Sequence, residues 1–190
     1  MSVSKDIVLV RGEEFVWLDL SFYDRTAAEF ELEGFSLIGD IEFAIWSEFF
    51  GRCFRRTMCS RDGTIVVEIY HEKARGLNFV LRFFFGARYS CKEKCLTTEF
   101  SDGGLVYTVT GKKTGKNWPL PHGVSKEIVG RKIRVRDMIE VHKNKVKSYL
   151  ESNPDASALS IKSFESWVES MYRVKRLAGG SSLQSKEGPG

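Results

Sequence analysis

Residues 64–71, Thr64-Ile65-Val66-Val67-Glu68-Ile69-Tyr70-His71, decide the fold class of this chain. The segment is rich in β-branched residues, and its alternation predicts a strand whose residues Ile65, Val67 and Ile69 share one inner face. The turn signal Arg61-Asp62-Gly63 comes directly before it and follows another strand-like segment. This arrangement indicates an antiparallel hairpin within a sheet.

Further strand-like segments lie on both sides of this stretch and are separated by turn signals. They cover residues 15–20, 35–43, 52–60, 77–85, 95–101 and 105–110. Their spacing predicts a meander-like antiparallel sheet of about five to seven strands. Alternation extends the inner face to Leu77, Phe79, Leu81, Phe83, Phe85, Leu105, Tyr107 and Val109.

Three helices are expected beside the sheet. A short one covers residues 25–33 with Asp24 as its cap. After a Gly- and Pro-rich loop at 111–130, residues 135–150 and 161–174 repeat apolar side chains at three-and-four spacing. The sequence therefore predicts an α+β fold, with an antiparallel sheet packed against one short N-terminal helix and two C-terminal amphipathic helices.

Length and composition predict one domain. The chain has 190 residues, of which 42% are hydrophobic, and this is enough material for a single core. We assign residues 1–177 to this domain and residues 178–190 to a flexible Gly/Ser-rich tail. The apolar run at 7–10 is far shorter than a signal sequence or a membrane span, so we expect a cytoplasmic protein without membrane contact.

Charge divides the chain into an acidic and a basic half. Residues 1–110 carry 13 Lys and Arg against 17 Asp and Glu, a net charge of −4, whereas residues 111–190 carry 16 against 8, a net charge of +8. Basic side chains next to aromatic ones suit single-stranded nucleic acid or another anionic ligand. The candidate binding residues are Arg55 and Arg82 on the second face of the sheet, joined by Tyr70, and Lys112, Lys113, Lys116, Arg131, Lys132, Arg134 and Arg136 in the basic segment 111–147.

Two short patches carry a family resemblance. Arg52-x-x-x-Arg56 and Glu99-x-Ser101-x-x-Gly104 resemble the two halves of the PilZ motif, which implies cyclic di-GMP as a ligand. The chain departs from that motif because Glu99 stands where the family has Asp or Asn, and 42 residues separate the halves. A basic strand flanked by turns explains the same residues without a ligand.

Cysteine and histidine positions do not indicate a metal site. Cys91 and Cys95 are separated by three residues, and on an extended strand they would lie roughly 13 Å apart, too far to share one ion. We therefore expect free thiols and no cofactor. His142 lies on the apolar stripe of a helix, which is typical of a hydrogen-bonded core residue. Without a nucleophile-elbow or triad signature, no catalytic residue is nominated.

The leading functional hypothesis is a non-catalytic binding or interaction module that presents charged surfaces to a protein partner. One alternative is a nucleic-acid or anionic-ligand binder that uses residues 111–147. The other is an enzyme or a small-ligand pocket between the sheet and the helices.

Overall fold

The structure is a computed structural model, and it describes residues 7–15, 18–43, 53–73, 90–111 and 123–183. The elements in chain order are β1 (Ile7–Leu9), the 3₁₀ turn η1 (Gly12–Glu14), α1 (Leu20–Leu32), β2 (Phe35–Phe43), β3 (Cys53–Ser60), β4 (Val66–Lys73), β5 (Ser90–Glu99), β6 (Leu105–Gly111), β7 (Val124–Gly130), α4 (Val135–Ser152) and α5 (Phe164–Leu183). The predicted α+β class is confirmed. The predicted strand at 77–85, with Arg82, lies outside the described residues.

Seven described strands form one sheet in the order β1-β2-β3-β4-β5-β6-β7. The strands from β1 to β6 are antiparallel to their neighbours, which confirms the predicted meander. The last pair differs, because β7 runs parallel to β6. The prediction of a loop throughout 111–130 is therefore wrong for residues 124–130, which extend the sheet by one strand.

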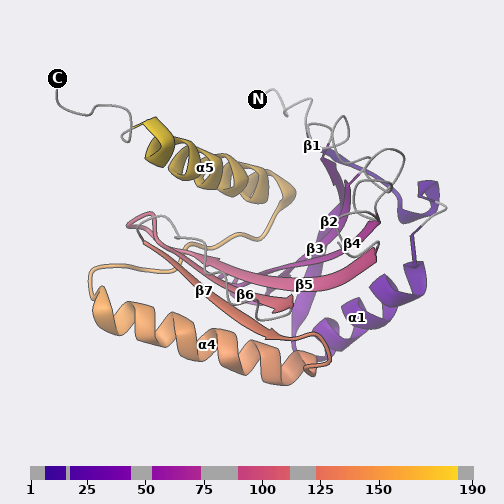
Figure 1. Cartoon of the computed structure of the whole chain (residues 1–190), viewed down its shortest axis with the longest axis horizontal. Helices are drawn as coiled ribbons and strands as arrows, with labels where there is room; N and C mark the ends of the chain where they lie inside the picture. The colour runs from indigo at the N-terminus through magenta and orange to yellow at the C-terminus, as the bar shows by residue number, and fades with distance from the viewer. Residues whose placement is uncertain (1–6, 16–17, 44–52, 74–89, 112–122, 184–190) are drawn as a thin grey trace, which may run out of the picture.

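The sheet is the middle layer of three (Figure 1). Helices α1 and α4 cover one face, which we call the α4 face, and α5 lies over the opposite face, which we call the α5 face. The main core lies on the α4 face, where buried Phe54, Met58 and Leu96 pack with helix residues such as Phe30 and Met138. A smaller cluster on the α5 face is centred on Trp167.

The prediction of the inner face is confirmed for strand β4 and wrong for strand β6. Val67 and Ile69 are fully buried in the main core, as the alternation predicted. On β6, however, Thr108 shares that face, because the register pairs Val67 with Leu96 and Leu96 with Thr108. The prediction that Leu105, Tyr107 and Val109 join the inner face is therefore wrong, and these residues point to the α5 face.

Two element boundaries also differ from prediction. The first helix begins at Leu20 rather than Arg25, because Asp19 caps it: the Phe22 amide donates to Asp19 Oδ1 at 3.1 Å. The last two residues of the predicted strand at 15–20 therefore belong to the helix, Asp19 as its cap and Leu20 as its first residue. Strand β5 begins at Ser90, inside the predicted connection, because its residues from 90 onward pair with β4.

His142 confirms its predicted role as a core residue. It is fully buried on α4, and its ring nitrogens lie 3.0 Å from the hydroxyl oxygens of Thr98 and Thr108. Both threonines stand on the α4 face of adjacent strands, so the histidine ties α4 to the sheet. Among the described helices, none combines the length and the apolar character needed to cross a bilayer.

Candidate functional site

A cavity of about 250 Å³ lies between α5 and the sheet, and we call it the α5 cavity. Its lining residues are Arg55, Val66, Glu68, Tyr70, Cys95, Thr97, Tyr107, Ile161, Trp167, Ser170, Met171 and Val174. Strands β3 to β6 supply the floor, and α5 with the segment before it supplies the roof. Most of the lining is apolar or aromatic, and a few polar groups are set into it, as in small-molecule sites generally.

The floor of the α5 cavity is fixed by strand register. Its side chains form three rows across the sheet: Val66–Thr97–Tyr107, Glu68–Cys95 and Arg55–Tyr70. The pairing of Arg55 with Tyr70 confirms that these two residues share the second face, as the sequence predicted. Because each row stands on paired strands, the backbone ladder holds its side chains at fixed spacing.

The roof is anchored on both sides of the cavity. Trp167 is only 2% exposed and packs in the cluster with Ile41, Val66 and Ile161. Six residues further along α5, Arg173 donates to both carboxylate oxygens of Glu99, at 2.6 and 3.0 Å. Between these anchors, the small side chain of Ser170 leaves space above the floor.

Glu68 is the most unusual group in the α5 cavity. The residue is 9% exposed, and its Oε2 accepts a hydrogen bond of 2.7 Å from Arg55 Nη1. Its Oε1 is buried and has no hydrogen-bond partner among the described residues. Thr57 pairs with Glu68 across the β3–β4 ladder, and its buried hydroxyl also has no hydrogen-bond partner among the described residues. The Thr57 hydroxyl and Glu68 Oε1 therefore do not bond to each other. An unsatisfied buried acceptor costs about 1–3 kcal/mol unless a donor reaches it.

Arg55 and Tyr70 belong to a larger polar network on the α5 face. The guanidinium carbon of Arg55 lies 5.3 Å from the centre of the Tyr70 ring, within range of a cation–π contact. The Tyr70 hydroxyl donates to Glu93 Oε2 at 3.0 Å, and Arg131 Nη2 donates to Glu93 Oε1 at 2.8 Å. Both oxygens of Glu93 are therefore satisfied, in contrast to those of Glu68.

The thiol and the two phenol groups of the cavity keep their protons near neutral pH. Burial, reinforced by the charge of Glu68, raises the pKa of the Cys95 thiol to about 12. Burial likewise raises the pKa of the Tyr70 and Tyr107 hydroxyls above their ordinary values. The cavity therefore offers neither a thiolate nor a phenolate as a nucleophile at neutral pH.

The predicted basic residues that the structure describes are divided between ion pairs and exposed positions. Arg55 pairs with Glu68, Arg131 pairs with Glu93, and the exposed Arg134 donates to Asp137 at 2.8 and 2.9 Å. Lys132 and Arg136 are exposed at the start of α4. Lys112, Lys113 and Lys116 lie outside the described residues. Of the predicted residues, Arg55 lines the α5 cavity, and Arg131 reaches its network through Glu93.

Sequence reasoning did not select Glu68, Cys95, Ser170 or Met171. One signal was present, because Glu68 is a charged residue in an otherwise apolar stretch. The sequence does not show that α5 covers that face, so nothing in it marks this carboxylate as buried.

The residues that resemble the PilZ motif are used for packing. Arg56 lies on the α4 face and donates to Asp40 and Asp24, whereas Glu99 lies on the α5 face and binds Arg173. Gly104 stands beneath Tyr149, so that a Cβ at this position would overlap the Tyr149 hydroxyl. Within the described residues, the two halves therefore do not form one ligand site; Arg52 lies outside them.

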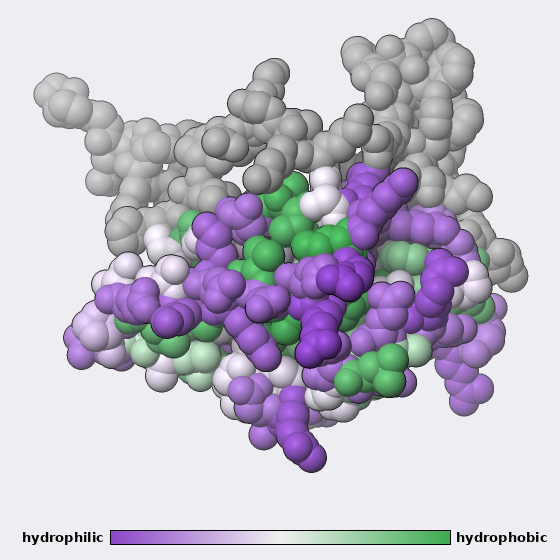
Figure 2. All heavy atoms as spheres, turned by 90° about the horizontal axis from the view of Figure 1, so that it is seen from below, coloured by the Kyte–Doolittle hydropathy of each residue, from purple (hydrophilic) through white to green (hydrophobic). Residues whose placement is uncertain are grey.

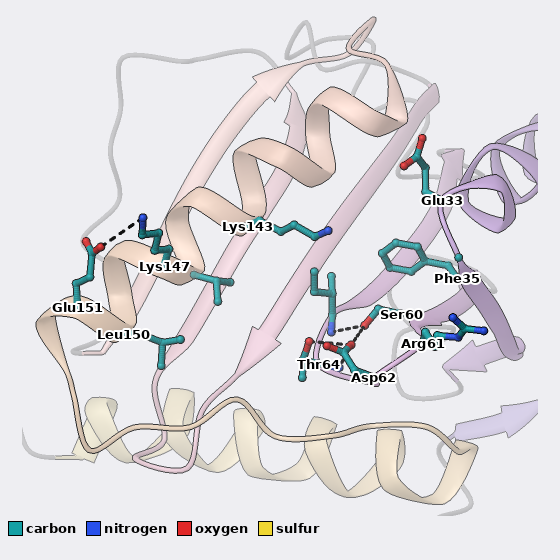
Figure 3. A pocket seen from close by; sticks show the side chains of 13 residues that line it. Glu33, Phe35, Ser60, Arg61, Asp62, Thr64, Lys143, Lys147, Leu150 and Glu151 are labelled. Carbon is teal, nitrogen blue, oxygen red and sulfur yellow. Dashed lines mark hydrogen bonds and ion pairs between the residues drawn. The ribbon is translucent and has the colours of Figure 1, made fainter.

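A second, more open depression lies on the α4 face, and we call it the α4 groove. It measures about 960 Å³ and is bordered by α4, the end of α1 and the β3–β4 turn. Figure 2 looks onto this face and shows hydrophobic surface framed by hydrophilic side chains. Figure 3 shows Lys143 and Lys147 on the α4 wall and Asp62 on the opposite wall. Asp62 Oδ1 accepts from the hydroxyls of Ser60 and Thr64, so this oxygen has partners within the groove.

Comparison with protein-family models, curated proteins and solved structures gave no match. The predicted protein and nucleic-acid partners therefore stay predictions. Among the described residues, no three His, Cys, Asp or Glu side chains converge as metal ligands would. The α5 cavity, with its buried carboxylate, is the candidate site that the geometry favours.

Proposed function

We propose that this protein is a non-catalytic binding module that takes a small molecule into the α5 cavity. The observation that carries the proposal is the buried Oε1 of Glu68, which has no hydrogen-bond partner among the described residues and belongs to a side chain that lines the α5 cavity. A buried acceptor of this kind calls for a donor from an ordered water or from a ligand. The apolar walls around it favour a ligand with an apolar body over a cluster of waters.

The size of the cavity supports this function. An apolar protein cavity of roughly 150 Å³ is large enough to bind benzene. The α5 cavity, at about 250 Å³, therefore has room for a one-ring or two-ring molecule. This volume lies just below the usual range of ligand sites, roughly 300–1,000 Å³, which favours a small metabolite over a nucleotide or a lipid.

The chemistry of the lining supports binding without catalysis. Cys95, Tyr70 and Tyr107 stay protonated at neutral pH, and the Glu68 carboxylate is held in an ion pair. General acid–base catalysis is most efficient with a group whose pKa lies near the working pH. The three protonated groups are far from that condition, so they serve as hydrogen-bonding and packing groups.

Toluene is the probe for the proposed function, because it fits the cavity size and carries neither charge nor a donor. We expect nuclear Overhauser contacts between toluene and the methyl groups of Met171 and Val174. Ser170→Leu should abolish them by filling the space under α5, whereas Glu169→Leu, on the exposed side of the same helix, should preserve them. Toluene contacts that are absent from the wild type, or that persist unchanged in Ser170→Leu, would reject the α5 cavity as a binding site.

We also propose the cytoplasm as the compartment. Cys59 and Cys95 are free thiols in the structure. Free thiols of this kind fit a reducing compartment, because oxidising ones favour disulfides.

A further inference from the structure

We infer that the ligand of the α5 cavity is an uncharged ring compound that donates an N–H or O–H hydrogen bond to Glu68 Oε1. This inference rests on the proposed function and adds the chemical class of the ligand. It depends on three features of the site: the hydrogen-bond acceptor Oε1 of Glu68, the neutral Arg55–Glu68 ion pair, and the aromatic side chains of the lining.

The open acceptor sets the need for a donor. A carboxylate in an ion pair with a guanidinium accepts hydrogen bonds and donates none. With Oε2 of Glu68 bound to Arg55, Oε1 is the oxygen left for a ligand donor. It is buried against the protein in this structure, so the Glu68 side chain would turn toward the cavity to meet that donor. Cys95 is paired with Glu68 across the β4–β5 ladder, but its thiol contacts other groups. Its sulfur lies 3.9 Å from the Leu96 carbonyl oxygen and 3.8 Å from the Thr97 hydroxyl oxygen.

The charge balance sets the ligand's charge. Arg55 and Glu68 neutralise each other across 2.7 Å, and the thiol and phenols of the lining stay protonated at neutral pH. A charged ligand would bring an uncompensated charge into a largely apolar space and would lose its hydration there. A neutral ligand avoids that loss and still satisfies Glu68.

The walls set the shape of the ligand. Tyr107 lies on the floor and Trp167 in the roof, with Met171 and Val174 beside it. Aromatic and thioether side chains pack well against the faces and edges of rings. Tyr107 also lines the cavity, and its protonated hydroxyl can donate to an acceptor elsewhere on the same ligand.

Phenol tests the donor requirement when it is compared with toluene across variants of Glu68. We expect Glu68→Met to weaken phenol binding about tenfold and to leave toluene binding unchanged, because one hydrogen bond to a charged acceptor is lost. Glu68→Gln keeps an acceptor oxygen and should weaken phenol only about threefold. Glu93→Gln is the matched control: both oxygens of this carboxylate already have partners, so neither probe should be affected.

Each outcome separates the inference from the proposed function. If phenol follows toluene in every variant, the donor to Glu68 is rejected while the binding site stands. If toluene fails to bind the wild type, the proposed function itself is rejected. Benzylamine and benzoate, both charged at pH 7, test neutrality. Tighter binding of either one than of phenol would overturn the inference of an uncharged ligand.

Discussion

Arg173 on α5 and Glu99 on β5 form a two-pronged ion pair, with N–O distances of 2.6 and 3.0 Å, and the Glu99 side chain is 2% exposed. A planar guanidinium suits this pairing because it presents two parallel donors to the two carboxylate oxygens. The pair fastens α5 to the sheet beside the α5 cavity. The roof of the proposed site therefore depends on a contact between segments 74 positions apart in the sequence.

Removing the Arg173 side chain should loosen this roof. We expect Arg173→Ala to lower the free energy of unfolding by about 2 kcal/mol, because it leaves the buried Glu99 carboxylate unpaired. Arg173→Lys keeps the positive charge but loses the two parallel hydrogen bonds of the guanidinium, so it should lower the free energy of unfolding by less. Urea denaturation measures both variants. Equal stability of Arg173→Ala and the wild type would show that the pair does not hold α5 in solution.

Protonation of His142 should destabilise the protein in mild acid. Burial lowers the pKa of His142 from its ordinary value of 6.5 to about 4. As the pH falls through 6.5, the unfolded chain takes up a proton that the folded protein does not, so stability falls with pH between about 6.5 and 4. The full loss is about 3 kcal/mol.

Urea denaturation at pH 7.0, 5.5 and 4.5 measures this loss. His142→Gln has no imidazole at this position, so its stability should depend less on pH across the same interval. The NMR chemical shift of the carbon-bound ring protons of His142 reports its titration in the folded protein. A midpoint near pH 6.5 would contradict the prediction.

Cys95 should resist alkylation at neutral pH. Its pKa is raised from 9.0 to about 12, so the reactive thiolate is about a thousandfold rarer than in an ordinary thiol. Iodoacetamide treatment followed by peptide mass spectrometry should find Cys95 unmodified in the folded protein and modified in urea. Rapid labelling of Cys95 in the folded protein would reopen the question of a catalytic thiol.

The exposed basic residues at the start of α4 should contribute little to stability. We expect the combined change of Lys132, Arg134 and Arg136 to Gln to leave the free energy of unfolding nearly unchanged, because exposed charges contribute little to stability. The unmodified protein should not bind oligonucleotides more tightly than the micromolar range. Submicromolar, salt-sensitive binding that disappears in the triple variant would favour the nucleic-acid alternative.

Local sequence patterns determined the class of the fold and several of its parts. Alternation placed Val67 and Ile69 on the core face and Arg55 and Tyr70 on the other, because side chains on a strand point to opposite faces in turn. Three-and-four spacing identified α4 and the buried position of His142. These predictions held because they depend on neighbours along the chain.

Only the tertiary structure decided how the two faces of the sheet are used. The pairing of Leu96 with Thr108 sets which side Tyr107 faces, and the parallel pairing of β7 depends on a return of the chain that no local pattern encodes. The position of α5 on the far face makes Glu68 a buried carboxylate, one oxygen of which has no partner among the described residues. The candidate site was not predictable from the sequence because it arises from contacts between distant segments, and those contacts depend on register and packing rather than on local propensity.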